Sequence, residues 1–357
     1  MKINWEKLDF KKIENWLIVS LAVLLLINLF LISNINFYNP EKAGKVNLKI
    51  TVINSDCDSC FNVLDLLESL KQQEVNVKKE EILDFSSDKA KALIKKYGIT
   101  KVPNMVVDGD VEKLNLGIFN KTKGVYVLSK VPLPYVDVAT GSVEGLVDVK
   151  ILVDPLCEEC SDAESAVLQL PQLGVVIGEQ KIIDVTKDNT IFTRYNLKLV
   201  PSVILSGDLE MYDIFPEIKN FFIKTPDGNY ILPPQAPYED MTTGNVLGLV
   251  SLINLVDKKC DGCYDVNNHL QVLQSFGIKI TDQKTLDISS KEGKKFLSKY
   301  GITKVPTIIL SSDAKYYSGL VKVWESVGKI SEDGSYIFIS TEAMGRYKDL
   351  GNNSIIG

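Results

Sequence analysis

The longest apolar stretch of the chain lies close to its start. Residues 16–33 carry no charge over 18 positions and show no polar face. As a helix that rises about 1.5 Å per residue they would cover about 27 Å, close to the hydrocarbon thickness of a bilayer. A core helix would have a polar face, and a cleaved signal peptide would be followed by a small-residue cleavage site, which residues 34–40 lack. The pattern therefore predicts an uncleaved transmembrane anchor at 16–33.

Lysines are distributed unequally around this stretch. Four precede it and two follow it within a dozen residues: Lys2, Lys7, Lys11 and Lys12, then Lys42 and Lys45. Cytoplasmic flanks of membrane helices carry the excess of positive charge. We therefore expect a cytoplasmic tail at 1–15 and a single-pass membrane protein whose remaining residues are extracytoplasmic.

Beyond the anchor, the apolar positions change between a period of two and a helical period. Alternation predicts strands at 48–53 and 75–85, with a third strand at 105–107, and helical spacing predicts helices at 61–70 and 89–97. Strands that alternate with helices and end in a hairpin predict an α/β sandwich of mixed strand direction.

Short polar motifs mark the ends of these elements. Ser87 and Asp88 are candidate caps of the second helix. Asp108-Gly109 favours a hairpin turn, and residues 206–208 and 311–313 occupy the corresponding places further on.

The sequence repeats itself three times. Three Cys-x-x-Cys pairs lie 100 and 103 residues apart. Each is followed by a Tyr-(Gly/Asn)-x-x-x-Val-Pro stretch whose proline lies 44 to 46 residues after the first cysteine: Tyr97–Pro103, Tyr195–Pro201 and Tyr300–Pro306. The first two repeats continue into a connector with the motif Pro-Tyr-x-Asp, at 134–137 and 237–240. A period of about a hundred residues indicates three small domains, which we place at 45–141, 142–244 and 245–357.

Composition narrows the chemistry. With 45% hydrophobic and 24% charged residues and a net charge of −6, the chain is typical of a folded protein and unlike a disordered or nucleic-acid-coating one. His269 is the only histidine, which excludes two-His metal motifs and a Ser-His-Asp triad in each repeat. All six cysteines lie in the three pairs.

These motifs together resemble the thioredoxin superfamily of thiol-disulfide oxidoreductases. A Cys-x-x-Cys at the start of the first helix, a Tyr-Gly-Ile-type helix end such as Tyr97-Gly98, and a Val-Pro followed by a strand match its pattern in all three repeats. The match covers about 90 of each hundred residues and leaves the anchor and the Tyr-rich connectors outside it. The arrangement is similar to a tandem protein disulfide isomerase-like chain. The resemblance implies three thioredoxin-like α/β sandwiches with mixed sheets behind the membrane anchor.

The resemblance also implies site residues. Its cis-proline would be Pro103, Pro201 and Pro306, and with Val102, Val200 and Val305 these residues would present backbone to an extended thiol substrate. We expect the first cysteine of each pair to lie at a helix N-terminus, where the dipole favours the thiolate. This makes Cys57, Cys157 and Cys260 the candidate nucleophiles and Cys60, Cys160 and Cys263 the candidate resolving thiols.

The expected function is thiol-disulfide exchange on exported proteins. The partners would be exported cysteine-containing proteins or a membrane thiol redox partner, with no cofactor besides the cysteine pairs, no metal and no nucleic acid. The acidic or small dipeptides within the pairs oppose thiolate formation and favour reductant-like or isomerase-like behaviour.

The chain departs from the family at positions that are associated with proton transfer at the active site. Asp56, Leu156 and Lys259 stand before the first cysteines in place of the usual Trp. Six residues before those cysteines, where a buried acid is often found, stand Thr51, Ile151 and Asn254. The sequence therefore assigns no proton acceptor to any of the three sites.

Other interpretations of the motifs stay open. The cysteine pairs would be inert structural disulfides if the repeats formed a non-catalytic peptide-binding or scaffolding array. Zinc would need two more ligands within a repeat, where no further Cys or suitable His exists, and copper would call for Met or His near the pair.

Two recurring or isolated polar residues have plain structural interpretations. His269 is expected to be a surface or packing residue and not a base. The recurring Asp84, Asp184 and Asp287 at strand ends are expected to stabilise turns. Local charge gives the last expectation, that the thiol pKa is highest at Cys157, which has Glu158 and Glu159 after it, and lowest at Cys260.

Overall fold

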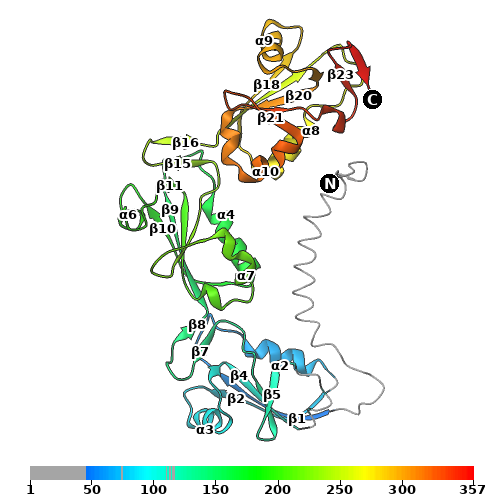
Figure 1. Ribbon diagram of the computed structural model, residues 1–357. Helices are drawn as coiled ribbons and strands as arrows, with labels where there is room; N and C mark the ends of the chain where they lie inside the picture. The colour runs from blue at the N-terminus through cyan, green and yellow to red at the C-terminus, as the bar shows by residue number, and fades with distance from the viewer. Residues whose placement is uncertain (1–45, 74, 110, 112–113, 115–116) are drawn as a thin grey trace. The chain divides into compact units, whose positions relative to one another are not determined.

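The computed structural model describes residues 46–357 except 74, 110, 112–113 and 115–116 (Figure 1). The chain forms two compact units, one ending at Leu146 and the other comprising Val147–Gly357. The expected tail at 1–15 and anchor at 16–33 lie outside the described residues. Within the described part, no helix is both long and apolar enough to span a bilayer.

The first repeat is built on a five-stranded mixed sheet. Its strand order is β2-β1-β4-β6-β5, with β1 and β2 parallel and the other neighbours antiparallel. The strands are β1 (Val46–Asn54), β2 (Val75–Asp84), β4 (Asn104–Gly109), β5 (Phe119–Thr122) and β6 (Val125–Leu128). The predicted α/β class and mixed strand direction are confirmed.

The second unit contains this sheet twice more in the same order. The second repeat has β10-β9-β12-β14-β13 and the third has β18-β17-β20-β22-β21. These strands are β9 (Leu146–Val153), β10 (Val176–Asp184), β12 (Ser202–Gly207), β13 (Ile223–Lys224), β14 (Tyr230–Leu232), β17 (Val250–Val256), β18 (Ile280–Asp287), β20 (Thr307–Leu310), β21 (Gly328–Ile330) and β22 (Tyr336–Phe338).

Helices accompany each sheet. The first repeat has α2 (Val63–Lys71) and α3 (Asp88–Tyr97); the second has α4 (Ala163–Val167), α5 (Gln169–Gln172), α6 (Thr190–Arg194) and α7 (Phe215–Ile218); the third has α8 (Asn268–Ser275), α9 (Lys291–Tyr300) and α10 (Ser318–Val327). Short 3-10 turns are η3 (Leu209–Met211), η4 (Lys219–Phe221), η5 (Ser312–Tyr316) and η6 (Thr341–Ala343). Ser87 caps α3 as expected, its side chain accepting from the Ala90 amide.

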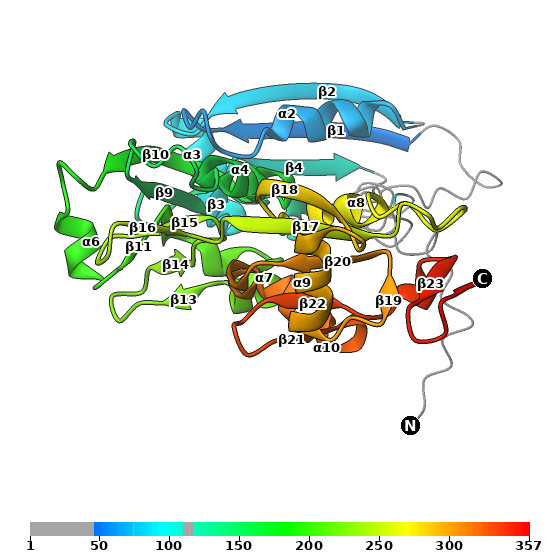
Figure 2. The same ribbon diagram turned by 90° about the horizontal axis from the view of Figure 1, so that it is seen from above.

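Strand β1 alternates between buried and exposed residues over its first half and buries side chains on both faces toward its end. Ile50 and Val52 of β1 pack on one side with Leu67 of α2, and Ile53 packs on the other with Ala90 of α3. All five residues are no more than 1% exposed. Figure 2 shows α2 running along β1 and β2.

A second, three-stranded sheet joins each connector to the strand before the motif proline. The sheets are β3 (Lys101–Val102) with β7 (Tyr135–Asp137) and β8 (Val143–Glu144), β11 (Leu199–Val200) with β15 (Tyr238–Asp240) and β16 (Asn245–Leu247), and β19 (Lys304–Val305) with β23 (Tyr347–Asp349) and β24 (Ser354–Ile356). We call the last two strands of each sheet the connector hairpin. The first two hairpins run across the expected domain boundaries at 141/142 and 244/245.

One predicted turn is wrong. Gly109 does not turn the chain but ends β4, paired with Leu48 of β1. The two-residue hairpin turn is Lys123-Gly124, between β5 and β6, and both residues have positive φ. Gly109 is required for a different reason, because a Cβ there would stand 2.2 Å from the Asn47 carbonyl oxygen.

Candidate functional site

Each cysteine pair forms a disulfide within its own repeat. The Cα atoms of Cys57 and Cys60 are 5.3 Å apart, and those of the second and third pairs are 5.5 and 5.6 Å apart. All six cysteines are part-exposed. A thiol from solution can therefore reach each disulfide.

The cysteines lie before the helices and not in their first turns, which corrects the sequence expectation. The helices begin at Val63, Ala163 and Asn268, three, three and five residues after the second cysteine of each pair. The effect of a helix dipole fades within its first turn. Side chains that surround each disulfide must therefore decide how stable its thiolates are.

The prolines that follow Val102, Val200 and Val305 are all preceded by cis peptide bonds. In the second repeat, Cys160 Sγ lies 3.7 Å from the Val200 carbonyl oxygen. In the first repeat, both cysteines pack against a cluster that includes Val102. Each disulfide is thus held beside its cis-proline loop, as the resemblance implied. Substrate binding by these loops stays a prediction.

The connector hairpins belong to the sites, although the sequence comparison left them outside. The residue after the second cysteine donates its amide hydrogen to a connector carbonyl in every repeat. These bonds are Phe61 N to Pro134 O (2.8 Å), Ser161 N to Pro237 O (2.7 Å) and Tyr264 N to Arg346 O (2.8 Å). The recurrence of Pro-Tyr-x-Asp was the signal available in the sequence.

The hairpins also occupy the edge of the strand before each cis-proline. Val102, Val200 and Val305 are paired in antiparallel register with Val136, Glu239 and Lys348. The resemblance placed the backbone of an extended substrate at the Val-Pro loops. Because β3, β11 and β19 are outer strands of their sheets, the hairpin covers one of the two edges of each strand.

The residue between Tyr and Asp of the hairpin, hereafter the hairpin residue, differs in charge among the repeats. It is Val136 in the first, Glu239 in the second and Lys348 in the third. The position three before the first cysteine changes with it, and is Asn54, Asp154 and Asp257. The first pair is neutral, the second is doubly acidic and the third combines an acid with a base.

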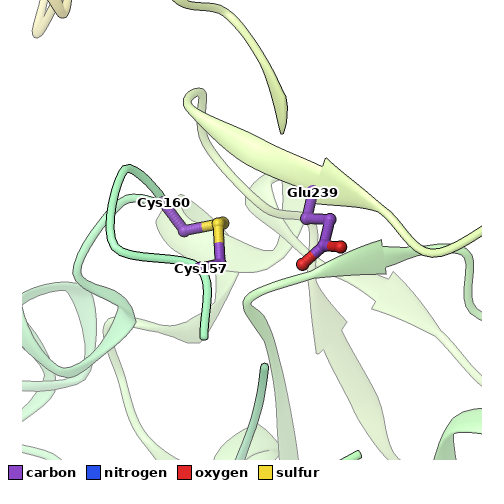
Figure 3. Close-up of side chains that lie close together, drawn as sticks. All are labelled: Cys157, Cys160 and Glu239. Atoms are coloured by element: carbon purple, nitrogen blue, oxygen red, sulfur yellow. A yellow bond between two sulfur atoms is a disulfide. The ribbon is translucent and has the colours of Figure 1, made fainter. Parts of the chain in front are cut away.

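In the second repeat, Glu239 of the acidic pair lies against the disulfide. A carboxylate oxygen of Glu239 and the sulfur atoms of Cys157 and Cys160 all lie within 4.8 Å of one another. Figure 3 shows the Glu239 side chain directed from its strand toward the disulfide. Burial raises the pKa of Glu239, and the charge of Asp154 and a hydrogen bond with it raise the pKa further.

This trio is the one group of three potential metal ligands among the described residues. As a disulfide, the two sulfurs offer no thiolate, and the thiolate is the form that binds metals. In the oxidised state, Glu239 therefore faces a disulfide that offers no thiolate ligand.

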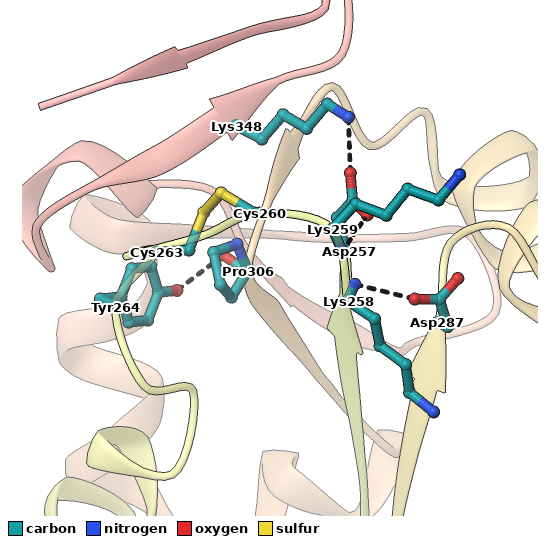
Figure 4. The surroundings of a disulfide bond; sticks show 9 residues. All are labelled: Asp257, Lys258, Lys259, Cys260, Cys263, Tyr264, Asp287, Pro306 and Lys348. Atoms are coloured by element: carbon teal, nitrogen blue, oxygen red, sulfur yellow. Dashed lines mark hydrogen bonds and ion pairs between the residues drawn. A yellow bond between two sulfur atoms is a disulfide. The ribbon is translucent and has the colours of Figure 1, made fainter.

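In the third repeat, the two charges neutralise each other. Lys348 Nζ lies 2.5 Å from Asp257 Oδ2, and the two side chains are only 18% and 5% exposed. Figure 4 shows Lys348 reaching past the Cys260–Cys263 disulfide to this carboxylate. Burial raises the pKa of Asp257, but hydrogen bonds from Lys348 and the Lys259 amide outweigh burial and hold this pKa below its usual range.

His269 is a packing residue, as expected, and it is buried. It is 5% exposed, and its ring lies edge-on to Phe338 at 4.6 Å between centroids. The Tyr264 hydroxyl donates to the Pro306 carbonyl at 2.7 Å and lies 3.1 Å from His269 Nε2 (Figure 4 shows the Tyr264–Pro306 bond). Burial lowers the pKa of His269 to about 4, so the ring is neutral near pH 7.

The recurring aspartates at strand ends stabilise turns, as predicted. Asp84, Asp184 and Asp287 each accept a hydrogen bond from the backbone amide two residues later, at 2.6, 3.0 and 2.7 Å. Glu158 and Glu159, which motivated the expected thiol ranking, are exposed. Asp154 and Glu239 are the less exposed acids of that site.

Comparison with known proteins gives only remote matches. No protein-family model matches the chain, and no curated protein matches it. Solved structures that match include form II of ERdj5, at 14% identity over 78% of this chain and 40% of that one, with a TM-score of 0.15. The zinc-bound form of human ERp44 matches at 11% identity over 75% of this chain and 81% of that one, also with a TM-score of 0.15.

Both matches are thioredoxin-fold proteins. The chain spans about two-fifths of the length of ERdj5, and neither match decides what the chain does. The described residues themselves establish a mixed α/β chain of three sheet-plus-helix repeats, each with one Cys-x-x-Cys disulfide beside a cis-proline.

Proposed function

We propose that the chain is a membrane-anchored thiol-disulfide oxidoreductase that acts on exported proteins through its three Cys-x-x-Cys sites. The observation that supports this most directly is the same in every repeat: a part-exposed disulfide of adjacent motif cysteines beside a cis X-Pro bond. Exposed disulfides of this kind are open to attack by a client thiolate. The lysine asymmetry around 16–33 supports an extracytoplasmic location for the repeats.

The chemistry would follow the order of the cysteines. A thiolate at Cys57, Cys157 or Cys260 attacks a client disulfide, and one client sulfur leaves with the bonding electron pair. The second cysteine of the pair then attacks the first, which releases the other client sulfur as a thiolate. The cysteine pair loses two electrons and the client disulfide gains two, or the reverse when the client is a dithiol.

A second function has one specific observation in its favour. The connector hairpins occupy one edge of the strands at Val102, Val200 and Val305, so a client backbone could pair only with the other edge while the hairpin stays in place. A non-catalytic scaffold with structural disulfides would have no need of the covered edge.

The two functions are separated by one experiment on the full chain in detergent. Thiols are counted with and without reductant, and the reduced protein is then tested for insulin reduction. An oxidoreductase has three disulfides that reductant converts to six thiols, and an activity that is lost when Cys57, Cys157 and Cys260 are replaced by Ser. A scaffold shows no activity above that of the triple-serine variant.

The location is tested separately. A membrane-impermeant thiol reagent applied to intact cells after mild reduction is expected to label the cysteine pairs. Labelling only after the membrane has been breached would contradict the extracytoplasmic assignment.

A further inference from the structure

We propose that the hairpin residue makes the three disulfides chemically different, and that Glu239 is the proton-transfer residue of the second site. This inference rests on the proposed thiol-disulfide exchange. The sequence assigned no proton acceptor to any site, because no repeat has an acid six residues before the first cysteine, and Glu239 would supply one in the second repeat.

The position of Glu239 is fixed from three sides. Its strand β15 is paired with Val200 of β11 on one side and with Val246 of β16 on the other. The bond from the Ser161 amide to the Pro237 carbonyl ties the start of the hairpin to the cysteine loop. Both neighbouring strands present a valine opposite Glu239, so the ionisable groups that act on it are Asp154 and the two cysteines.

This placement suits a group that exchanges a proton with a thiol. A carboxylate oxygen within 4.8 Å of both sulfurs is within reach after a small side-chain rotation or through one water molecule. Partial burial and the neighbouring Asp154 both favour the protonated carboxyl, which brings its proton affinity closer to that of a thiol.

Closure of the Cys157–Cys160 disulfide combines a proton transfer with a thiol-disulfide exchange. After the Cys157 thiolate has formed a mixed disulfide with a client, the Cys160 thiol gives its proton to the Glu239 carboxylate. The resulting thiolate attacks Cys157 Sγ, the Cys157–client bond breaks, and the client sulfur leaves with the electron pair. In the reverse direction, the Glu239 carboxyl protonates the Cys160 thiolate that leaves the opening disulfide.

The other two repeats lack this function. Val136 carries no ionisable group, and Lys348 is paired with Asp257 at 2.5 Å. In neither repeat does the hairpin residue offer a carboxylate to the disulfide. The identity of the hairpin residue therefore distinguishes the second site from the first and the third.

The test uses the full chain with Ser at the four cysteines of the first and third repeats. Glu239→Gln is compared with the parent and with a Glu158→Gln/Glu159→Gln control, which removes two exposed acids of the same loop. Iodoacetamide alkylation of the reduced pair reports the thiol pKa. Release of glutathione from the preformed mixed disulfide reports the closing step.

We expect opposite changes in the two rates. Without the like charge, Glu239→Gln should lower the thiol pKa by about one unit, so alkylation at pH 7 becomes about tenfold faster. Without the proton acceptor, closing at pH 7 should become at least about tenfold slower, and this deficit should shrink toward pH 9. Glu239→Asp should restore part of the closing rate, and the control should change either rate less than about twofold.

Two results would overturn the inference. One is a Glu239→Gln variant with unchanged alkylation and closing at every pH, and the other is a control that matches it. If circular dichroism shows that Glu239→Gln is unfolded, Glu239→Val carries the test, because it removes the carboxylate and installs the residue of the first repeat, and a closing rate equal to the parent's would refute the role. Failure of the proposed function looks different: the parent would not form or release the mixed disulfide, while the alkylation profiles would still test Glu239.

Discussion

Replacing Lys348 with Met should destabilise the third repeat severely, because it leaves the Asp257 carboxylate buried without its partner. The Asp257 side chain is 5% exposed, and among the residues that the structure describes it keeps only the Lys259 amide as a hydrogen-bond donor. Removing one member of a buried ion pair costs about 3–5 kcal/mol. We expect a loss of that size in the free energy of unfolding of the third repeat at pH 7.

The stability difference between the parent and Lys348→Met should depend on pH. In the parent, the folded-state pKa of Asp257 is lowered, so its ion pair stabilises the fold above about pH 4 and loses this contribution as the pH falls through the folded pKa. In the variant, the orphaned carboxyl has a raised pKa, so its penalty is full near pH 7 and fades as the carboxyl becomes protonated. The difference between parent and variant should therefore shrink toward pH 4.

The chain itself supplies two controls. Asp257→Asn with Lys348→Val installs the Asn54 and Val136 pair of the first repeat, and should stay within about 1 kcal/mol of the parent because no charge remains buried. Lys304→Met breaks an exposed pair of the same repeat, with side chains 32% and 54% exposed, and should cost less than about 1 kcal/mol.

The assay is urea unfolding followed by Trp324 fluorescence. Trp324 is 3% exposed in the third repeat, and the only other tryptophans, Trp5 and Trp16, are replaced by Phe in the background. Two results would contradict the predicted role of the Lys348–Asp257 pair. One is a loss in the free energy of unfolding below about 1 kcal/mol for Lys348→Met, and the other is a double variant as unstable as Lys348→Met.

Three further predictions concern other features. The stability of the third repeat should fall by about 3 kcal/mol as the pH drops from 6.5 to 4, because burial lowers the pKa of His269 to about 4; His269→Gln should flatten this slope in urea titrations. Gly109→Ala should lower the thermal unfolding midpoint of the first repeat far more than Gly98→Ala, because only the former puts a Cβ 2.2 Å from a backbone oxygen. Alkylation of single-pair variants should rank the thiol pKa highest at Cys157 and lowest at Cys260; the reverse order would refute the charge argument.

The sequence predicted most of each sheet, because the signals involved are local. Alternating β-branched residues located β1 and β2, and Ser87 with Gly98 marked both ends of α3. The start of α2 was misplaced because Phe61 has the apolar spacing of a helix. Its amide is instead bonded to the Pro134 carbonyl, and no local pattern reveals a partner so far along the chain.

The cysteines and prolines of the site were evident from their spacing, whereas the groups that surround them were not. Glu239 and Lys348 each lie far from their cysteines in the sequence, and only the register of a three-stranded sheet brings them to the disulfides. Their charges also differ, so repetition could reveal the position but not its chemistry.

The hairpin residue varies among the repeats while the sheets keep the same strand order. Val136 is 8% exposed and belongs to the hydrophobic cluster against which Cys57 and Cys60 pack, whereas Glu239 and Lys348 are half-buried, so a charge at this position goes with a change in packing beside the disulfide. A duplicated unit that ends in such a hairpin can therefore acquire a new reactivity by two substitutions. One is at the hairpin residue and the other is three residues before the first cysteine. Copies of one domain can diverge in chemistry while their architecture stays the same.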